Sequence, residues 1–330
     1  MTSFIPWIGG KQKLLWLINK LAPASCTRFV DVFGGSGTVI MNRPYLKGCI
    51  EVYNDYNSNL TNLFCCVKDR TLSLLKELGF LPLNARDEFK VLLKFFKRDE
   101  FTDDYLDEEL ELAERYLPPP EAEAIKRLML ERAPRGDIRR AADYFKLIRC
   151  SYCGGGKTFA GDVCDIRAFF HLIWKCAQRL ANVVVENEDF EQLIKRYDKT
   201  TTWFYCDPPY YKAEDCYTVA FSKEDHQRLH DALLRCRGKV MVSYNDCAFI
   251  RELYQEFYVF LVKRPNSMSH KKGSQYVELV ITNYDPDECA AQIGMFRHVC
   301  GRGSHEDVPY ELIHKPRAGQ PAGNQDEGEL

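Results

Sequence analysis

The chain has 330 residues and a mass of 38.3 kDa, with 45% hydrophobic and 28% charged residues and a formal net charge of −2. This composition is typical of a soluble globular protein and excludes a wholly disordered or collagen-like chain. No apolar run approaches the roughly 20 residues of a membrane span, and the N-terminus lacks the basic and apolar regions of an export signal. We therefore expect a cytoplasmic protein that does not associate with membranes.

The 14 cysteines are scattered through apolar segments of a long chain. That distribution favours reduced thiols over a disulfide framework. The nearly balanced charge gives no overall basic signature, so any nucleic-acid binding must come from a local patch.

Short runs rich in β-branched and aromatic residues predict seven strands. They lie at residues 28–33, 49–54, 183–186, 203–207, 239–244, 257–262 and 276–282. Most are continuous apolar runs, the pattern of strands buried on both faces, and amphipathic helical segments separate many of them. The pattern predicts an α/β sheet.

The region between the second and third predicted strands has a charged, leucine-rich helical pattern instead. We predict a discontinuous sheet domain over residues 1–60 and 180–296, interrupted by a mainly helical insertion over 61–179 with a glycine hairpin near 150–160. Residues 297–330 are rich in Gly, Pro and charge, which predicts a mobile tail.

A glycine turn follows the first predicted strand, in the sequence Phe-Val-Asp-Val-Phe-Gly-Gly-Ser-Gly at 29–37. Glycines at such a strand-to-helix turn let backbone amides approach a ligand at the carboxyl edge of a sheet. The spacing is not the dinucleotide-binding G-x-G-x-x-G, there is no P-loop lysine, and Thr38 breaks the nucleophile-elbow pattern. Asp55 follows the second strand, where a carboxylate can accept hydrogen bonds from ribose hydroxyls. An aspartate in a surface turn is the alternative interpretation.

The most specific motif is Asp-Pro-Pro-Tyr at 207–210, after an apolar strand. Two successive prolines fix the backbone and remove two amide donors, so the Asp207 carboxylate and the Pro208 carbonyl can both accept from one amino group. When an amine attacks a methyl sulfonium its nitrogen gains positive character, which these acceptors favour in the transition state. Tyr210 offers a ring face on which a planar base can stack.

These motifs, in this order and with Pro-Trp-Ile-Gly-Gly-Lys at 6–11, resemble the adenine-specific DNA methyltransferases of the Dam type over roughly residues 4–285. The resemblance implies a Rossmann-like methyltransferase fold with a mixed seven-stranded sheet and S-adenosylmethionine as methyl donor. It implies that the acceptor is the N6 amino group of a flipped adenine in double-stranded DNA, at a specific site. We expect a monomer, and a cognate restriction enzyme is a candidate partner.

The resemblance also assigns roles to residues. The catalytic residues are Asp207, Pro208 and Tyr210, and the cofactor-binding residues are Trp7, Lys11, Asp31, Phe33, Gly34, Gly35, Asp55, Asp189, Phe190 and Asp207. For Trp7 a place in the core, and for Asp189 a helix N-cap, are the alternative interpretations.

Candidate DNA contacts fall in two segments. Residues 149–159 match the recognition hairpin of family members that read GATC but lack its Asn-Gly turn, so no recognition sequence follows. There, Arg149 and Lys157 are candidates for phosphate or guanine contacts, and Tyr152 or Phe159 for filling the space left by a flipped base. Asn266 and Lys271, in a basic loop over 263–273, are further candidates.

Other interpretations compete with this one. A zinc site built on Cys150, Cys153, Cys164, His171 and Cys176, or on His226 and His230, lacks the usual ligand spacing, and we expect no metal. A related enzyme acting on RNA adenine or on a protein glutamine would carry a similar motif, and so would a non-catalytic DNA-binding protein on the same scaffold. The aspartate and the helical insertion favour DNA, and the intact motifs favour an enzyme.

Overall fold

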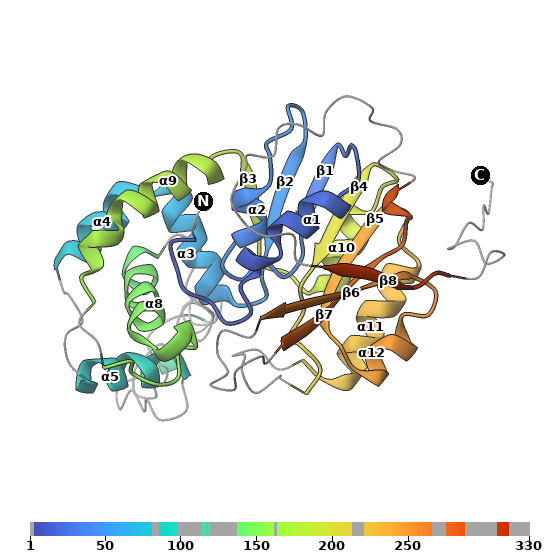
Figure 1. Ribbon diagram of the computed structural model, residues 1–330. Helices are drawn as coiled ribbons and strands as arrows, with labels where there is room; N and C mark the ends of the chain where they lie inside the picture. Colours follow the sequence, from blue (N-terminus) through green and yellow to red (C-terminus); the bar gives the residue numbers. More distant parts are fainter. Residues whose placement is uncertain are drawn as a thin grey trace. The chain divides into compact units, whose positions relative to one another are not determined.

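A computed structural model describes residues 3–80, 86–97, 114–115, 118, 137–161, 164–212, 221–265, 275–287 and 309–316 (Figure 1). The chain divides into two compact units. The sheet unit comprises residues 11–56 and 182–330 with Met1, and the helical unit comprises residues 2–10 and 57–181.

The sheet unit holds a mixed sheet, which has eight strands in the described residues. Its spatial order is β3 (Val183–Glu186), β2 (Ile50–Asn54), β1 (Arg28–Asp31), β4 (Thr202–Cys206), β5 (Lys239–Asn245), β7 (Gln275–Thr282), β6 (Tyr258–Pro265), β8 (Tyr310–His314). Strands β1 to β5 are parallel to one another, whereas β7 is antiparallel to both β5 and β6. The predicted α/β class and all seven predicted strands are confirmed.

The expected count of seven strands is wrong, because residues 310–314 of the expected mobile tail form β8, antiparallel to β6. The edge of β6 presents unpaired backbone groups that can bind another strand. Tyr310 also packs its ring near Trp16 and Phe260, at 6.0 and 6.3 Å between centroids. These contacts explain how a short strand forms within a segment whose average composition is that of a tail.

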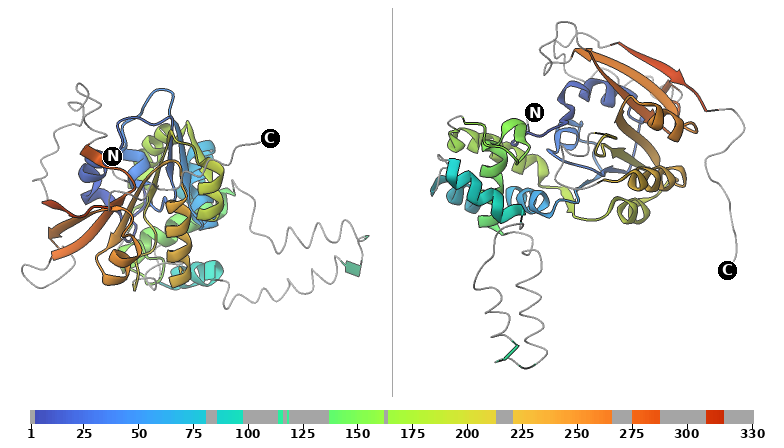
Figure 2. Two further views of the ribbon diagram at one scale, coloured as in Figure 1. Left: turned by 90° about the vertical axis from the view of Figure 1, so that its right-hand side faces the viewer. Right: turned by 90° about the horizontal axis from the view of Figure 1, so that it is seen from below.

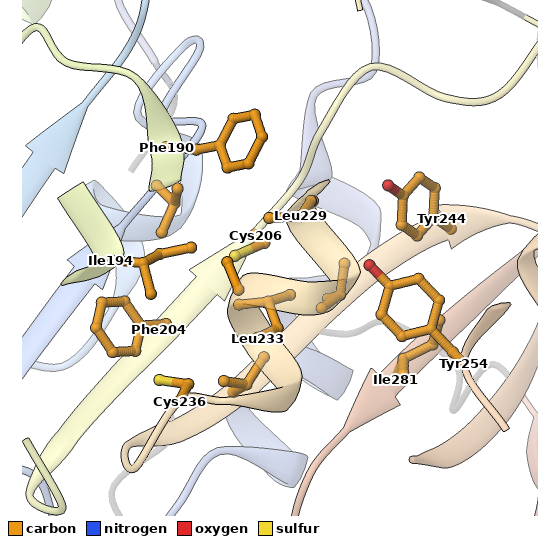
Figure 3. Close-up of a cluster of buried hydrophobic side chains, with 14 of the residues drawn as sticks. Phe190, Ile194, Phe204, Cys206, Leu229, Leu233, Cys236, Tyr244, Tyr254 and Ile281 are labelled. Atoms are coloured by element: carbon orange, nitrogen blue, oxygen red, sulfur yellow. The ribbon is translucent and has the colours of Figure 1, made fainter. Parts of the chain in front are cut away.

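Helices cover both faces of the sheet, as expected for strands buried on both sides. One face carries α10 (Phe190–Tyr197), α11 (Lys223–Leu234) and α12 (Ala248–Leu253). Figure 3 shows Phe190 and Ile194 of α10 and Leu229 and Leu233 of α11 around Cys206 of β4. The blue helix α1 (Leu15–Leu21) lies on the opposite face from α11 and α12 (Figure 2). Two short helices, η1 (Lys11–Lys13) and α2 (Thr38–Asn42), complete this part of the unit.

The helical unit contains α3 (Ser58–Asp69), α4 (Thr71–Phe80), α5 (Arg86–Lys97), α8 (Ile138–Cys150), η2 (Tyr152–Gly154), η3 (Ile166–Phe169) and α9 (Phe170–Leu180). Helix α3 begins at Asn57, whose side chain accepts hydrogen bonds from the amides of Asn59 and Leu60. That is the arrangement of an N-cap.

The first residues of the chain belong to the helical unit, not to the sheet domain in which the sequence placed them. Phe4 is fully buried, and its ring lies 5.1 Å from Phe64 of α3 and 6.4 Å from Phe145 of α8. Burial of this aromatic side chain fixes the segment.

A tight hairpin joins α8 to the residues that follow. Ser151 and Phe159 form an antiparallel bridge, and the Tyr152 amide donates to the Thr158 carbonyl at 2.7 Å. Gly154 and Gly156 turn the chain with φ angles of 73° and 64°, which glycine adopts readily. No helix in the described parts of the chain is both long and apolar enough to cross a membrane.

Candidate active site

The strand order changes direction between β1 and β4, which lie side by side and are flanked by β2 and β5. In open α/β sheets, ligands bind at the carboxyl ends of the strands at such a switch point. Asp31 is the last residue of β1 and is paired in register with Tyr205 of β4, two residues before Asp207. The strand order therefore brings two sequence-predicted carboxylates to one edge.

Both carboxylate oxygens of Asp207 have partners. Lys11 Nζ lies 2.6 Å from Oδ2, and the Ser243 hydroxyl donates to Oδ1 at 2.9 Å. The Tyr205 hydroxyl lies 3.0 Å from Ser243 Oγ and extends this chain of hydrogen bonds. Burial raises the pKa of the Asp207 carboxyl, while Lys11 and Ser243 oppose that rise. Lys11, expected to contact the cofactor, is thus an ion-pair partner of the predicted catalytic aspartate.

Tyr210 is held from its hydroxyl end. The hydroxyl donates to Glu278 Oε1 at 3.0 Å, and Arg264 Nε donates to Glu278 Oε2 at 2.6 Å. The ring is 3% exposed, and Lys11 Nζ lies 4.9 Å from its centroid. The ring is therefore rigidly placed but covered.

The glycine turn is tied to the end of β2. The Gly34 amide donates to the Asn54 carbonyl at 2.7 Å, and the Gly35 amide donates to Asp55 Oδ2 at 3.0 Å. A Cβ atom at Gly34 would stand 2.2 Å from the Tyr53 ring, and Gly35 has φ of 50°. Neither position accepts a side chain without rearrangement.

Asn54 links three strand ends. Its side-chain nitrogen donates to the Val32 and Glu188 carbonyls at 2.9 and 3.2 Å, and its oxygen accepts from the Glu188 amide at 2.9 Å. These bonds hold the segment after β3 against the ends of β1 and β2, so the predicted cofactor residues of three strands share one edge.

Asp189 and Phe190 follow this segment. Asp189 is the N-cap of α10, accepts from the Glu191 amide at 3.0 Å, and forms an ion pair with Arg228 at 3.1 Å. Phe190 packs near Phe33, 5.7 Å between centroids. The N-cap interpretation of Asp189 thus describes its contacts, and a cofactor role for either residue stays a prediction.

Asp31 has a buried carboxylate oxygen that lacks a hydrogen-bond partner among the described residues. The residue is 1% exposed, and the oxygen in question is Oδ2. Burial and the neighbouring Asp207 and Asp55 carboxylates raise the pKa of Asp31 to about 8. A buried oxygen without a partner is costly, which makes Asp31 a strong acceptor for a cationic or hydrogen-bonding ligand.

Trp7 and the candidate DNA contacts at 149–159 lie in the helical unit. Arg149 is partly buried, donates to the Phe4 carbonyl at 2.8 Å, and stacks 3.4 Å from the centroid of the Phe169 ring. These contacts hold the helical unit together, and a DNA contact by Arg149 stays a prediction. Phe159 is half-buried against Phe89 at 5.4 Å. Tyr152, at 67% exposure, and Lys157 are exposed. Asn266 and Lys271 lie outside the described residues.

No group of three or more His, Cys, Asp or Glu side chains in the described residues is arranged to hold a metal ion. His226 contacts the Tyr244 hydroxyl at 2.8 Å, and His230 contacts Asp231 at 3.0 Å. The two histidines therefore have separate partners.

Sequence reasoning missed Ser243, Glu278 and Arg264. Two of them could have been noticed in the sequence, because Ser243 and Glu278 are polar residues inside the apolar strands β5 and β7. Both side chains are fully or almost fully buried. A buried polar side chain requires a partner, but the identity of that partner depends on the sheet order.

Comparison with known proteins identifies the family of this chain. A family model described as "D12 class N6 adenine-specific DNA methyltransferase" matches residues 7–131 and 171–268. The type II methyltransferase M1.LlaDCHI of Lactococcus lactis subsp. cremoris is 26% identical over 298 residues, covering 86% of this chain and 96% of that protein. The DNA adenine methylase of Salmonella typhi is 24% identical over 309 residues, covering 86% and 95%, and that of Serratia marcescens is 26% identical over 283 residues, covering 81% and 92%. Because the family model spans more than half of the chain and includes the glycine turn and Asp207 at the switch point, the chain belongs to the D12 class and is an adenine-specific DNA methyltransferase.

Proposed function

We propose that the protein transfers a methyl group from S-adenosylmethionine to the N6 amino group of an adenine that has rotated out of double-stranded DNA at a specific sequence. The observation that carries the proposal is the environment of Asp207, a partly buried carboxylate at the switch point whose two oxygens are oriented by Lys11 and Ser243. Such an oriented acceptor suits an amino group that gains positive charge in the transition state.

The residues at the ends of β1 and β2 fit the cofactor. Asp31 Oδ2, buried and without a partner among the described residues, would accept from the ammonium of the methionine part. Asp55 would accept from the ribose hydroxyls, and the rings of Phe33 and Phe190 provide an apolar surface. When bound, S-adenosylmethionine supplies a methyl group on a sulfonium, which a neutral amine can attack directly.

In this proposal the adenine amino group would bind the Asp207 carboxylate that Lys11 contacts in the structure. The Lys11 ammonium contacts Asp207 and also lies over the Tyr210 ring. Because Tyr210 is only 3% exposed, a base would stack on its ring only after neighbouring side chains move, Lys11 among them. We infer that the incoming amino group takes over the Asp207 contact from Lys11, whose ammonium otherwise balances the charge of that carboxylate.

The test is methyl transfer from tritiated S-adenosylmethionine to unmethylated bacterial genomic DNA, followed by nucleoside analysis and single-molecule sequencing. Wild-type protein should place the label in N6-methyladenine, and the sequencing gives the recognition site. Asp207→Asn should lower kcat by about 10²-fold or more, because the amide carries no charge to stabilise the developing cation.

Asp231→Asn is the matched control, because Asp231 lies on α11 and contacts His230 and Gln227. It should keep wild-type turnover, and both variants should bind S-adenosylmethionine in calorimetry. Near-normal turnover by Asp207→Asn would show that Asp207 has no catalytic role. Label in RNA or protein but not in DNA would contradict the proposed substrate.

The similarity to a type II methyltransferase supports a role in restriction-modification, with a restriction enzyme of the same specificity as partner. If so, the recognition site found by sequencing must be protected from cleavage by that enzyme after methylation. We further propose that the protein acts as a monomer, which light scattering of the DNA complex would test.

A further inference from the structure

Two cysteines lie in contact at the edge of the sheet opposite the proposed active site. Cys26 precedes β1 and Cys49 precedes β2, so both are at the amino ends of these parallel strands. Their sulfur atoms are 3.7 Å apart. The Ile50 amide donates to the Thr27 carbonyl at 3.0 Å, so the backbone beside both cysteines is fixed by the sheet.

A buried arginine completes this cluster. Arg43 Nη2 lies 3.0 Å from Cys26 Sγ, and both terminal nitrogens lie 3.8 Å from Cys49 Sγ. Glu51 Oε1 accepts from Arg43 Nη1 at 3.1 Å, and the guanidinium packs over the rings of Phe29 and Trp203. The arginine is thus held in place beside both sulfurs.

The charge distribution favours one thiolate in the pair. The hydrogen bond from Cys26 lowers the pKa of the Cys49 thiol to about 6, assisted by Arg43 and opposed by burial and by Glu51. The same hydrogen bond and burial raise the pKa of Cys26. A thiolate next to a guanidinium and in contact with a second thiol is the arrangement found at reactive cysteines. Cys26 is partly exposed and Cys49 is 8% exposed, so a small oxidant can reach the pair.

We propose that Cys26 and Cys49 form an oxidation site that closes to a disulfide on reaction with hydrogen peroxide or an alkyl hydroperoxide. Neither residue belongs to the methylation site, and none of the roles assigned above uses them.

The reaction balances in two steps. The thiolate attacks one peroxide oxygen, the O–O bond breaks, and the sulfur becomes a sulfenic acid while hydroxide leaves from hydrogen peroxide, or an alkoxide from an alkyl hydroperoxide. The second sulfur then attacks the sulfenic sulfur, forming the S–S bond, and the oxygen leaves as water with the proton of the second thiol. In total, two thiols lose two electrons to the peroxide. The sulfurs must approach from 3.7 Å to about 2.0 Å, which side-chain rotation can supply.

The test is treatment of the full-length protein with hydrogen peroxide at neutral pH, followed by proteolysis without reductant and mass spectrometry. A peptide pair linked through Cys26 and Cys49, lighter by two hydrogens than the reduced pair, is the expected product. Its formation should be at least about tenfold faster than oxidation of Cys247, because the paired sulfurs lie beside the Arg43 guanidinium and each has a second sulfur in contact to complete the disulfide.

Single variants distinguish a resolving pair from a merely reactive cysteine. In Cys26→Ser and Cys49→Ser the disulfide cannot form, and the remaining sulfur should accumulate a sulfenic acid that a cyclic diketone traps. Cys247→Ser, in the same unit, is the matched control and should form the Cys26–Cys49 link at the wild-type rate. Peptide mapping separates this product from oxidation at Cys150 and Cys164 in the helical unit.

The proposal is overturned if Cys26 and Cys49 stay reduced while Cys247 is oxidised, or if the three cysteines react at equal rates. The wild-type measurement decides this even if a serine variant does not fold. Reversal of the link by a dithiol reductant, with recovery of the original mass, would complete the assignment.

Discussion

Tyr210 shows how one side chain of the site is positioned by residues far away in the sequence. Its hydroxyl is bonded to Glu278 of β7, which is itself paired with Arg264 of β6. The phenol is therefore anchored at its polar end, and under the proposed mechanism a base would contact its ring.

Substitutions at this position separate the ring from the hydroxyl. Tyr210→Ala should lower kcat/KM for DNA by roughly 10- to 100-fold, because base–aromatic stacking is lost. Tyr210→Phe keeps the ring and should cost about fivefold or less in kcat/KM. It should also reduce the free energy of unfolding by about 1 to 2 kcal/mol, because Glu278 loses a donor. Steady-state kinetics and urea unfolding measure both effects, and equal kinetic losses for the two variants would contradict the stacking role.

Asp31 should make the stability of the folded protein depend on pH when no cofactor is bound. Its folded-state pKa of about 8 lies above the unfolded value of 3.8, so the folded state retains a proton that the unfolded state has lost between these values. Stability should therefore fall as pH rises from about 4 to about 8, by up to about 1.4 kcal/mol per pH unit from this group.

Asp31→Asn cannot titrate and removes this contribution. The stability of Asp31→Asn relative to wild type should increase as the pH is raised from 5 to 8, and then level off. Thermal unfolding of both proteins across this pH range, without cofactor, measures the difference. A difference that does not change with pH would show that Asp31 is already ionised in the folded protein.

At the level of elements, the hairpin after α8 depends on a glycine pressed against the N-terminal segment. A Cβ atom at Gly154 would lie 2.5 Å from the Pro6 carbonyl oxygen, whereas at Gly161 it would meet nothing within 4 Å. Both glycines have positive φ, 73° and 82°. The two positions therefore differ in packing but not in backbone strain.

Gly161→Ala should lower the free energy of unfolding by about 1 kcal/mol, the cost of a left-handed alanine. Gly154→Ala should cost clearly more, because the Pro6 backbone must also move. Denaturant unfolding of the two variants isolates the effect of the close contact. Equal losses would mean that the segment before Lys11 shifts without cost.

For the whole molecule, a net charge of −2 provides no general attraction to DNA, so binding must rely on local cations. Lys157 is the exposed cation of the hairpin. If it contacts phosphate, Lys157→Ala should weaken binding to all DNA sequences similarly and reduce the slope of log K against log salt concentration by about 1.

Lys199 is the matched control, since it is exposed and precedes β4 at the edge of the sheet opposite the proposed site. Lys199→Ala should leave the slope unchanged in fluorescence anisotropy titrations. The same loss in both variants would point to a general charge effect and not to a phosphate contact.

We expect the proposed methyl transfer to need no metal, because the proposed acceptors at Asp207 and Pro208 and the sulfonium of the donor would supply the chemistry. Activity should therefore be the same with and without a strong chelator, measured as tritium incorporation into DNA. Loss of activity on chelation with recovery on addition of zinc would indicate a metal role for the cysteine-rich segment 150–176.

The sequence alone determined seven of the eight described strands, the glycine turn, the Asp-Pro-Pro-Tyr motif and the family, because a few neighbouring residues specify each of them. Apolar runs identify buried strands wherever the strands end up in a sheet. Asp55 and Asp207 could be named for the same reason, since Asp55 directly follows a predicted strand and Asp207 ends one. Asp31 could be named because it lies in the first predicted strand, just before the glycine turn.

The tertiary structure decided which of these groups meet. The pairing of Lys11 with Asp207, the support of Asp207 by Ser243, and the anchoring of Tyr210 by Glu278 and Arg264 join segments that are far apart along the chain. The contact of Cys26 with Cys49 and the addition of β8 at the sheet edge are of the same kind. Each depends on strand order and register, which set the neighbours of every side chain and which no local pattern of residues specifies.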